Sequence, residues 1–156
     1  MLNVNELDPK SCAEMARTCA CLGFRKASRS VTQLYDQFLA PSGLRSTQLV
    51  VLLSAYVLGS SNLRRLADEL AMDRSTLTRN LKPLIVQRLL RTVPGKGRGR
   101  SKSIEVTLRG QDKLRTAAPL WQLAQESLRE RLGDDRLSRV LGDLEVVTES
   151  VRKSQI

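Results

Sequence analysis

The sequence predicts a mainly α-helical fold with one small β-hairpin. Apolar residues recur at helical spacing over most of the 156 residues. Only two short segments alternate as strands do, and a glycine-rich stretch separates them. The length suits a single domain of ordinary size, and 41% hydrophobic residues with only 3% aromatic residues indicate a core of Leu, Val, Ile and Ala.

Two helices are expected in the first third of the chain. Over 12–39 the apolar residues fall at roughly helical spacing, and the run Ala-Pro-Ser-Gly at 40–43 would end that helix. Those apolar residues are Leu22, Ala27, Val31, Leu34, Phe38 and Leu39. Ser46 or Thr47 is expected to cap the second helix. Its body at 49–58 is almost wholly apolar, which predicts a helix buried in the middle of the domain, and a Gly-Ser-Ser-Asn run ends it.

A pair of helices joined by a tight turn comes next. The first is predicted over 63–71, Met72 and Asp73 form the turn, and the second runs from about 74 to about 89. Asp73 is a good N-cap because its carboxylate can accept hydrogen bonds from exposed helix amides. Pro83 removes one helical hydrogen bond, which predicts a kink. The inward residues are expected to be Leu63, Leu66, Ala67 and Leu70, then Leu77, Leu81, Leu84 and Ile85.

Two strands and two further helices complete the pattern. Strands at 90–93 and 103–107 flank the segment 94–102, whose three glycines in five residues suit a flexible hairpin loop. Beyond the hairpin, Gly133 separates two apolar stripes of helical period. The first stripe holds Leu114, Leu120, Trp121, Ala124, Leu128 and Leu132, and the second holds Leu137, Val140, Leu141, Leu144, Val147 and Val151.

The charge distribution points to a polyanionic partner. The formal net charge is +10 and the pI is near 10.3. The segment 74–104 contains no Asp or Glu but nine basic residues, whereas a solvated surface ordinarily mixes both signs. These nine are Arg74, Arg79, Lys82, Arg88, Arg91, Lys96, Arg98, Arg100 and Lys102. Two alternatives stay open: a basic composition that serves solubility alone, and a chance run of solvated charge.

Taken together, residues 63–102 predict a winged helix-turn-helix that binds duplex DNA. Helix, turn, helix and hairpin in this order present the second helix to the major groove. Its outward side chains can donate to phosphates or read base edges. They are Arg74, Ser75, Thr76, Thr78, Arg79 and Lys82. Arg98 and Arg100 on the hairpin, or wing, would enter the minor groove. The alternative is an exposed basic hairpin with no ligand.

The order of these segments resembles the MarR family of winged helix-turn-helix regulators over residues 12–153. The segments are Leu-Ala-Asp-Glu-Leu at 66–70, Asp-Arg-Ser-Thr-Leu-Thr-Arg-Asn-Leu at 73–81, the basic hairpin, and Val-Thr-Leu-Arg-Gly at 106–110. The resemblance implies a homodimer on a pseudo-palindromic operator, usually a repressor that an effector releases. The chain departs from the family at three positions: Arg98 replaces a frequent Asp, Arg88 replaces a helix-ending glycine, and Pro83 is unusual.

The expected domain organisation follows from the apolar ends of the chain. Residues 45–109 would form the DNA-binding domain, and 1–40 with 110–156 would supply the dimerisation helices. The terminal helices have more apolar positions than one small domain can cover, so pairing with a second copy would bury them. Packing of these helices onto the same subunit is the alternative.

Three cysteines, Cys12, Cys19 and Cys21, fall on the first predicted helix. On an unbroken helix Cys12 and Cys19 share a face and Cys21 points nearly opposite, so the trio cannot hold one metal ion. Small buried hydrophobes are the commonest role of such cysteines, and this alternative stays open. Other expected effectors are an aromatic or phenolic molecule, in a cleft between the dimer helices and the winged domain, and a soft metalloid bound to thiolates from two subunits.

Residues 21–29 together with Tyr35 are similar to the organic-hydroperoxide-sensing branch of the MarR family. That similarity implies that Cys21 is the reactive cysteine and that Tyr35 is one tyrosine partner. Fourteen helical residues span about 21 Å, so Tyr35 would reach Cys21 only from the other subunit. Arg25 and Ser46 stand where that branch has two further tyrosines.

Several classes of function are excluded or disfavoured. The chain has no histidine, which excludes His-dependent acid–base catalysis, Ser-His and Cys-His nucleophiles and His-ligated metal sites. We expect no enzyme, no cofactor and no metal site. No segment has the length of a membrane helix, and the N-terminus lacks the features of a signal peptide, so we expect a cytoplasmic protein without a membrane partner. The competing classes are a non-specific architectural DNA-binding protein and a thiol peroxidase.

Overall fold

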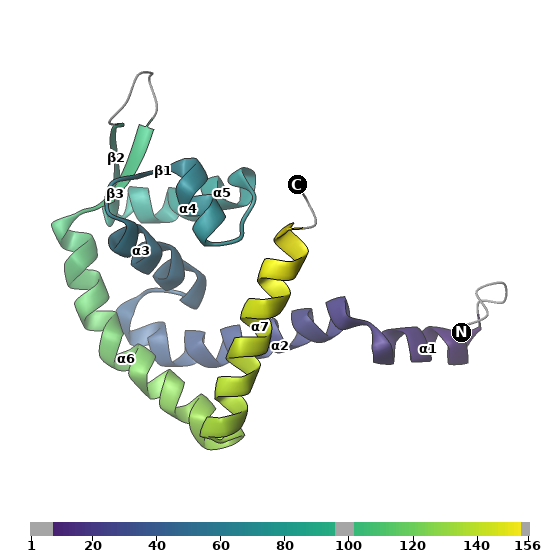
Figure 1. Cartoon of the computed structure of the whole chain (residues 1–156). Helices are drawn as coiled ribbons and strands as arrows, with labels where there is room; N and C mark the ends of the chain where they lie inside the picture. The colour runs from purple at the N-terminus through teal and green to yellow at the C-terminus, as the bar shows by residue number, and fades with distance from the viewer. Residues whose placement is uncertain (1–7, 96–101, 154–156) are drawn as a thin grey trace. The chain divides into compact units, whose positions relative to one another are not determined.

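A computed structural model of the chain describes residues 8–95 and 102–153 (Figure 1). The elements in chain order are α1 (Pro9–Thr18), α2 (Ala20–Leu39), a 3-10 turn η1 (Ala40–Ser42), α3 (Ser46–Leu58), β1 (Ser61–Asn62), α4 (Leu63–Glu69), α5 (Arg74–Val86), β2 (Leu90–Pro94), β3 (Lys102–Val106), α6 (Leu108–Leu132) and α7 (Asp134–Lys153). This confirms the mainly helical fold with a small sheet. The chain divides into two compact units between Leu34 and Tyr35, which are described separately.

In the first unit the chain forms two helices where the sequence predicted one over 12–39. The break lies at Cys19, whose backbone is extended with φ −72° and ψ 107°. The Cys19 Sγ accepts a hydrogen bond from the amide of Leu22 at 3.4 Å, and the Cys19 carbonyl accepts from the amide of Gly23 at 3.0 Å. The prediction of one helix is wrong because Cys19 leaves the helical conformation and caps α2 with its sulfur instead.

In the second unit α3 is buried on one side only. Leu49, Val51, Leu52 and Ala55 are buried, whereas Val50, Leu53, Tyr56 and Val57 are exposed. The expectation of a wholly buried helix is therefore wrong. The reason is that α3 packs against α4, α5, α6 and β3, and these elements leave the opposite side of the helix uncovered.

The start of α3 also differs from the prediction that Ser46 or Thr47 caps it. The capping position is Arg45, with an extended backbone at φ −88° and ψ 156°. The side-chain Oε1 of Gln48 accepts from the Arg45 amide at 2.9 Å. The Ser46 amide donates to the carboxylate of Asp36 at 2.6 Å. The helix end is thus satisfied by a side chain three residues ahead and by one from α2, which makes a hydroxyl cap unnecessary.

The predicted helix pair is confirmed as α4 and α5. Asp73 caps α5 as expected. The predicted inward residues Leu66, Ala67, Leu77, Leu81 and Leu84 are buried, and Leu63 and Leu70 are half-buried against the core. Ile85 is exposed, contrary to the prediction, since the last turn of α5 reaches beyond the packed face. α5 ends at Val86 rather than near 89, because Arg88 adopts the left-handed conformation with φ 59°.

The sheet has three antiparallel strands in the order β1-β3-β2. β2 and β3 are the two predicted strands, with Leu90 opposite Val106 and Thr92 opposite Ile104. The sequence missed β1, where Ser61 pairs with Ile104, because two residues are too short for an alternating pattern. The hairpin segment 96–101 lies outside the described residues, and with it lie Arg98 and Arg100.

Thr107 directly follows β3 and joins this strand, the chain after α5 and the start of α6. Its hydroxyl accepts from the Gly110 amide at 3.0 Å, which caps α6, and donates to the Arg88 carbonyl at 2.7 Å. Gly110 follows in the first turn of α6, where a Cβ atom would lie 2.2 Å from the Leu89 carbonyl oxygen. The strand therefore ends one residue earlier than predicted, and the start of α6 is packed closely against the chain after α5.

The helical end of the chain is as predicted, with Gly133 (φ 79°) between α6 and α7. Ala117 and Ala124 of α6 and Leu137 of α7 are buried. The rest of the predicted second stripe is exposed: Val140, Leu141, Leu144, Val147 and Val151. None of the helices in the described ranges is long and apolar enough to cross a membrane.

Candidate nucleic-acid interface

The first turn of α5 is organised by the carboxylate of Asp73. The hydroxyls of Ser75 and Thr76 donate to it at 2.6 and 2.7 Å, and the Thr76 amide donates at 2.8 Å. These bonds, led by the one from the Ser75 hydroxyl, hold the pKa of Asp73 well below its ordinary value. The carboxylate is therefore charged at neutral pH, and both hydroxyls are directed toward it.

A second set of bonds continues along the outer face of α5. The Arg79 guanidinium donates to the Thr76 hydroxyl oxygen at 3.1 Å, and the Thr78 hydroxyl donates to the Arg74 carbonyl at 2.7 Å. Arg79, Thr76 and Asp73 thus form one chain of hydrogen bonds on the surface. An arginine held in this way has fewer conformations to lose when a ligand binds.

The structure brings six of the eight predicted DNA-contacting residues together on this helix. Arg74, Ser75, Thr78, Arg79 and Lys82 are exposed, and Thr76 is half-buried. Leu77, Leu81 and Leu84 on the opposite side of the same helix are buried in the core. The outer face of α5, defined by those six residues, is therefore open to a partner.

The basic run from the sequence analysis is not uniform in the structure. Arg91 of β2 forms an ion pair with Glu105 of β3 at 2.9 Å, so part of its charge is neutralised. Glu105 lies one residue beyond the acid-free segment and directly opposite Arg91 in the register. On the strands Arg91 is thus paired, whereas Arg74, Arg79 and Lys82 leave three positive charges exposed on α5.

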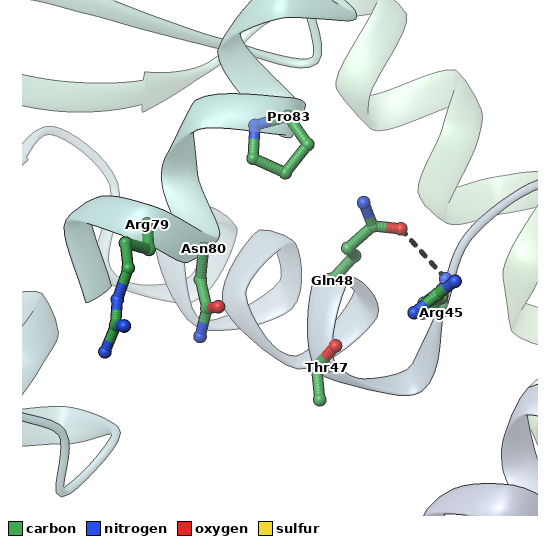
Figure 2. Close-up of a pocket in the computed structure, with 6 residues that line it drawn as sticks. All are labelled: Arg45, Thr47, Gln48, Arg79, Asn80 and Pro83. Atoms are coloured by element: carbon green, nitrogen blue, oxygen red, sulfur yellow. Dashed lines mark hydrogen bonds between the residues drawn. The ribbon is translucent and has the colours of Figure 1, made fainter. Parts of the chain in front are cut away.

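A hollow of about 350 Å³ lies beside the outer face of α5, and sequence reasoning missed most of it (Figure 2). Its lining residues are Arg45, Thr47, Gln48, Arg79, Asn80 and Pro83. The first three come from the start of α3 and the last three from α5. Only Arg79 was predicted as a site residue, because periodicity within one helix cannot indicate which distant segment packs beside it.

The cysteines are exposed in the single chain, so no other part of the same subunit buries them. Cys12, Cys19 and Cys21 are all free thiols at the surface of the first unit. Within the described residues, no group of three or more His, Cys, Asp or Glu side chains is placed to hold a metal ion. Cys19, rather than Cys21, has a described contact, as the cap of α2.

Tyr35 belongs to the second unit and has a partner within its own chain. Its hydroxyl donates to the side-chain oxygen of Gln125 on α6. Burial of the ring raises the pKa of Tyr35 above its ordinary value. The phenol is therefore neutral at physiological pH, and it fastens the end of α2 to α6.

An apolar hollow of about 390 Å³ lies between α3 and α6. Leu49, Leu53 and Tyr56 line it from α3, and Leu114, Ala118 and Trp121 line it from α6, with Arg115 at its edge. Its walls are almost entirely apolar, which suits an aromatic or aliphatic group.

Comparison with solved structures finds close likeness to transcription regulators. The chain is 35% identical to the transcriptional regulator MosR of M. tuberculosis in complex with DNA, with a TM-score of 0.78, over 88% of this chain and 99% of that chain. Another structure of MosR gives 34% identity and a TM-score of 0.71, over 86% and 98%. A mutant of MarR from E. coli complexed with operator DNA is 20% identical, with a TM-score of 0.76, over 85% of this chain and 97% of that chain. This is a likeness of fold alone. No family model and no curated protein matches the chain.

Proposed function

The chain belongs to the MarR family of winged helix transcription regulators, and we propose that it binds a pseudo-palindromic operator as a homodimer. It is a DNA-binding transcription regulator, in a family that is not enzymatic. The observation that carries the proposal is the outer face of α5, where arginine, lysine and hydroxyl side chains are exposed on the second helix of a helix-turn-helix. Such a helix enters the major groove, and these residue types contact phosphates and base edges.

The residues proposed to contact DNA are those of the α5 face, together with Arg98 and Arg100 of the wing. Arg74 and Lys82 would contact phosphates from the two ends of the face, and Arg79 would contact a guanine or a phosphate. MosR, 35% identical to this chain, was solved in complex with DNA, which supports the same use of this fold here.

The proposed homodimer would be formed by residues 1–40 and 110–156, while 45–109 would form the DNA-binding domain. The exposed stripe on α7 supports this, since Leu141 and Leu144 are 54% and 40% exposed in the single chain. A two-fold pair would present two α5 helices about 34 Å apart, the length of one DNA turn.

We propose that the regulator is a repressor released by an effector. Oxidation or electrophile binding at Cys21 would change the spacing of the two α5 helices. The free thiol of Cys21 supports this, because it lies on a helix proposed to form the dimer, where oxidation of a thiol would alter the pairing. The alternative effector is a small aromatic molecule, which the apolar hollow between α3 and α6 favours. A metalloid bound to thiolates of two subunits is a further alternative.

Footprinting on DNA that flanks the protein's own gene tests the proposal, followed by fluorescence anisotropy with the protected fragment. We expect binding about 10³-fold tighter than to unrelated DNA at the same salt. Arg79→Ala should weaken operator binding at least tenfold. Arg139→Ala removes the same charge from the side of α7 away from its apolar stripe and should leave binding unchanged. Equal affinity for operator and unrelated DNA would instead indicate an architectural protein.

A further inference from the structure

The polar hollow beside α5 has the composition of an anion site. Two of its six lining residues are arginines, one from each helix, and none is a carboxylate. The side chains of Arg45 and Arg79 are both exposed. The two arginines stand at opposite sides of the hollow (Figure 2), and both attract an anion that enters it. The hydroxyl of Thr47 and the amide of Asn80 add hydrogen-bonding groups to the same walls.

At the start of α3 the amides of Ser46, Gln48 and Leu49 have partners within the chain, so the proposed site does not rest on them. The Arg45 carbonyl accepts from the amides of Gln48 and Leu49, and its own amide donates to the Gln48 side chain. The Ser46 amide donates to the carboxylate of Asp36. The backbone of Arg45 is therefore fixed by three hydrogen bonds while its side chain reaches the hollow (Figure 2).

The hollow is continuous with the outer face of α5. Arg79 belongs to both, since it lines the hollow and donates to Thr76 on the outer face. Asn80 is half-buried, and its amide points to the Met72 sulfur at 3.7 Å, which fixes the wall next to the turn before α5. A helix in the major groove lies between the phosphates of the two strands. The anion closest to this hollow in a complex is thus a phosphate that flanks the groove.

We propose that this hollow binds a phosphate of the DNA backbone, with Arg45 as its principal ligand and Arg79 and Thr47 beside it. The inference rests on the proposed function, and it adds the start of α3 to an interface that the sequence confined to α5 and the wing. Because backbone phosphates occur in every sequence, Arg45 contributes affinity and position but no base discrimination.

The first test compares Arg45→Ala with the wild type and with Arg139→Ala on operator and unrelated duplexes over a range of salt. The backbone bonds of Arg45 do not involve its side chain, so the variant keeps the helix start. We expect about tenfold weaker binding to both duplexes. The slope of log affinity against log salt should fall by about 1.8, because the dimer loses one phosphate contact in each of its two half-sites and each contact is worth about 0.9. Arg139→Ala should match the wild type in both quantities.

The second test replaces single phosphates of the operator with neutral methylphosphonates. For the wild type, we expect one linkage in each half-site at which replacing both symmetry-related phosphates together weakens binding about as much as Arg45→Ala does. At that linkage the replacement should have no further effect on Arg45→Ala, because the pair forms one contact. Thr47→Ala should show a smaller loss at the same linkage. Independent effects of the variant and of every replacement would overturn the proposal.

Inorganic phosphate distinguishes a backbone phosphate from a free anion. If millimolar phosphate displaces operator from the wild type but not from Arg45→Ala at equal ionic strength, while no methylphosphonate is coupled to Arg45, the hollow serves a soluble anion and the proposal is wrong. The inference and the proposed function fail separately. Specific operator binding that Arg79→Ala weakens, but that Arg45→Ala leaves intact in affinity and salt slope, overturns only the inference.

Discussion

Single residues set how the outer face of α5 is presented. Asp73 holds the hydroxyls of Ser75 and Thr76, and through Thr76 it positions the guanidinium of Arg79. Its charge opposes an approaching phosphate, so the same carboxylate that orders the face also disfavours non-specific contact with the backbone. Hydroxyl groups keep acceptor lone pairs while they donate to Asp73, and they remain available to base donors.

The cysteines give a prediction at the residue scale. A stoichiometric organic hydroperoxide should lower operator affinity of the wild type by about tenfold or more, within the usual range of allosteric coupling. Cys21→Ser should lose this response and keep the affinity of the reduced protein, measured by anisotropy with and without peroxide. Cys12→Ser and Cys19→Ser are matched controls that should respond as the wild type does. Unchanged release in Cys21→Ser would end the proposal for that residue. Steady peroxide turnover by the wild type would instead favour the peroxidase alternative.

What the sequence reveals about single residues depends on whether the signal is local. Asp73 and Gly133 were predicted correctly because an N-cap carboxylate and a helix-ending glycine act within a few residues. Cys19 was missed because sulfur is a rare cap and its neighbours have helical preference. Arg45 was missed because its importance arises from packing against α5, 34 positions further along the sequence (from 45 to 79).

At the scale of elements, the junction between β3 and α6 has almost no room for a larger side chain. Gly110→Ala would place a Cβ 2.2 Å from the Leu89 carbonyl oxygen and 2.7 Å from a Val106 methyl group. We expect the free energy of unfolding to fall by about 1–3 kcal/mol or more, as for overpacked cores. Urea denaturation at one fixed protein concentration measures it.

Gly142→Ala on α7 is the control for this substitution, since nothing lies within 4 Å of its added Cβ. Helix propensity predicts a gain of about 0.5–1 kcal/mol there. Equal stability of the two variants would show that the start of α6 can shift away from Leu89.

Helices and strands could be predicted where the apolar spacing and the helix-breaking residues indicated the same boundaries. The order of α3 to α7 with β2 and β3 follows from apolar spacing, the turn before α5 and Gly133. β1 was not predictable, because two residues have no period and pair only after β3 is in place. The outer face of α5 followed from its period, whereas the hollow beside it did not, because no local pattern reports which helices pack together.

At the scale of the whole molecule, the exposed apolar stripe on α7 predicts self-association. Leu144→Lys places a charge in the centre of that stripe and should convert dimers into monomers at micromolar concentration, because an unpaired charge in an apolar interface is strongly unfavourable. Sedimentation velocity measures the change.

Ser138→Lys adds the same charge on another side of α7 and should leave the dimer intact. A monomeric wild type, or a dimeric Leu144→Lys variant, would contradict the proposed pairing. Operator binding should weaken together with dimerisation, since two half-sites must be occupied at once.

The hydroxyl of Thr107 has a mechanical consequence. It fastens the chain after α5 to the first turn of α6, a helix of 25 residues and therefore about 37 Å long. The first turn of α6 is thus attached to the chain that follows α5, while the rest of this long helix extends away from it. A bound molecule or a second copy that moves α6 would therefore also move the end of α5, because the hydroxyl and the amide of Thr107 both bond to the chain after α5.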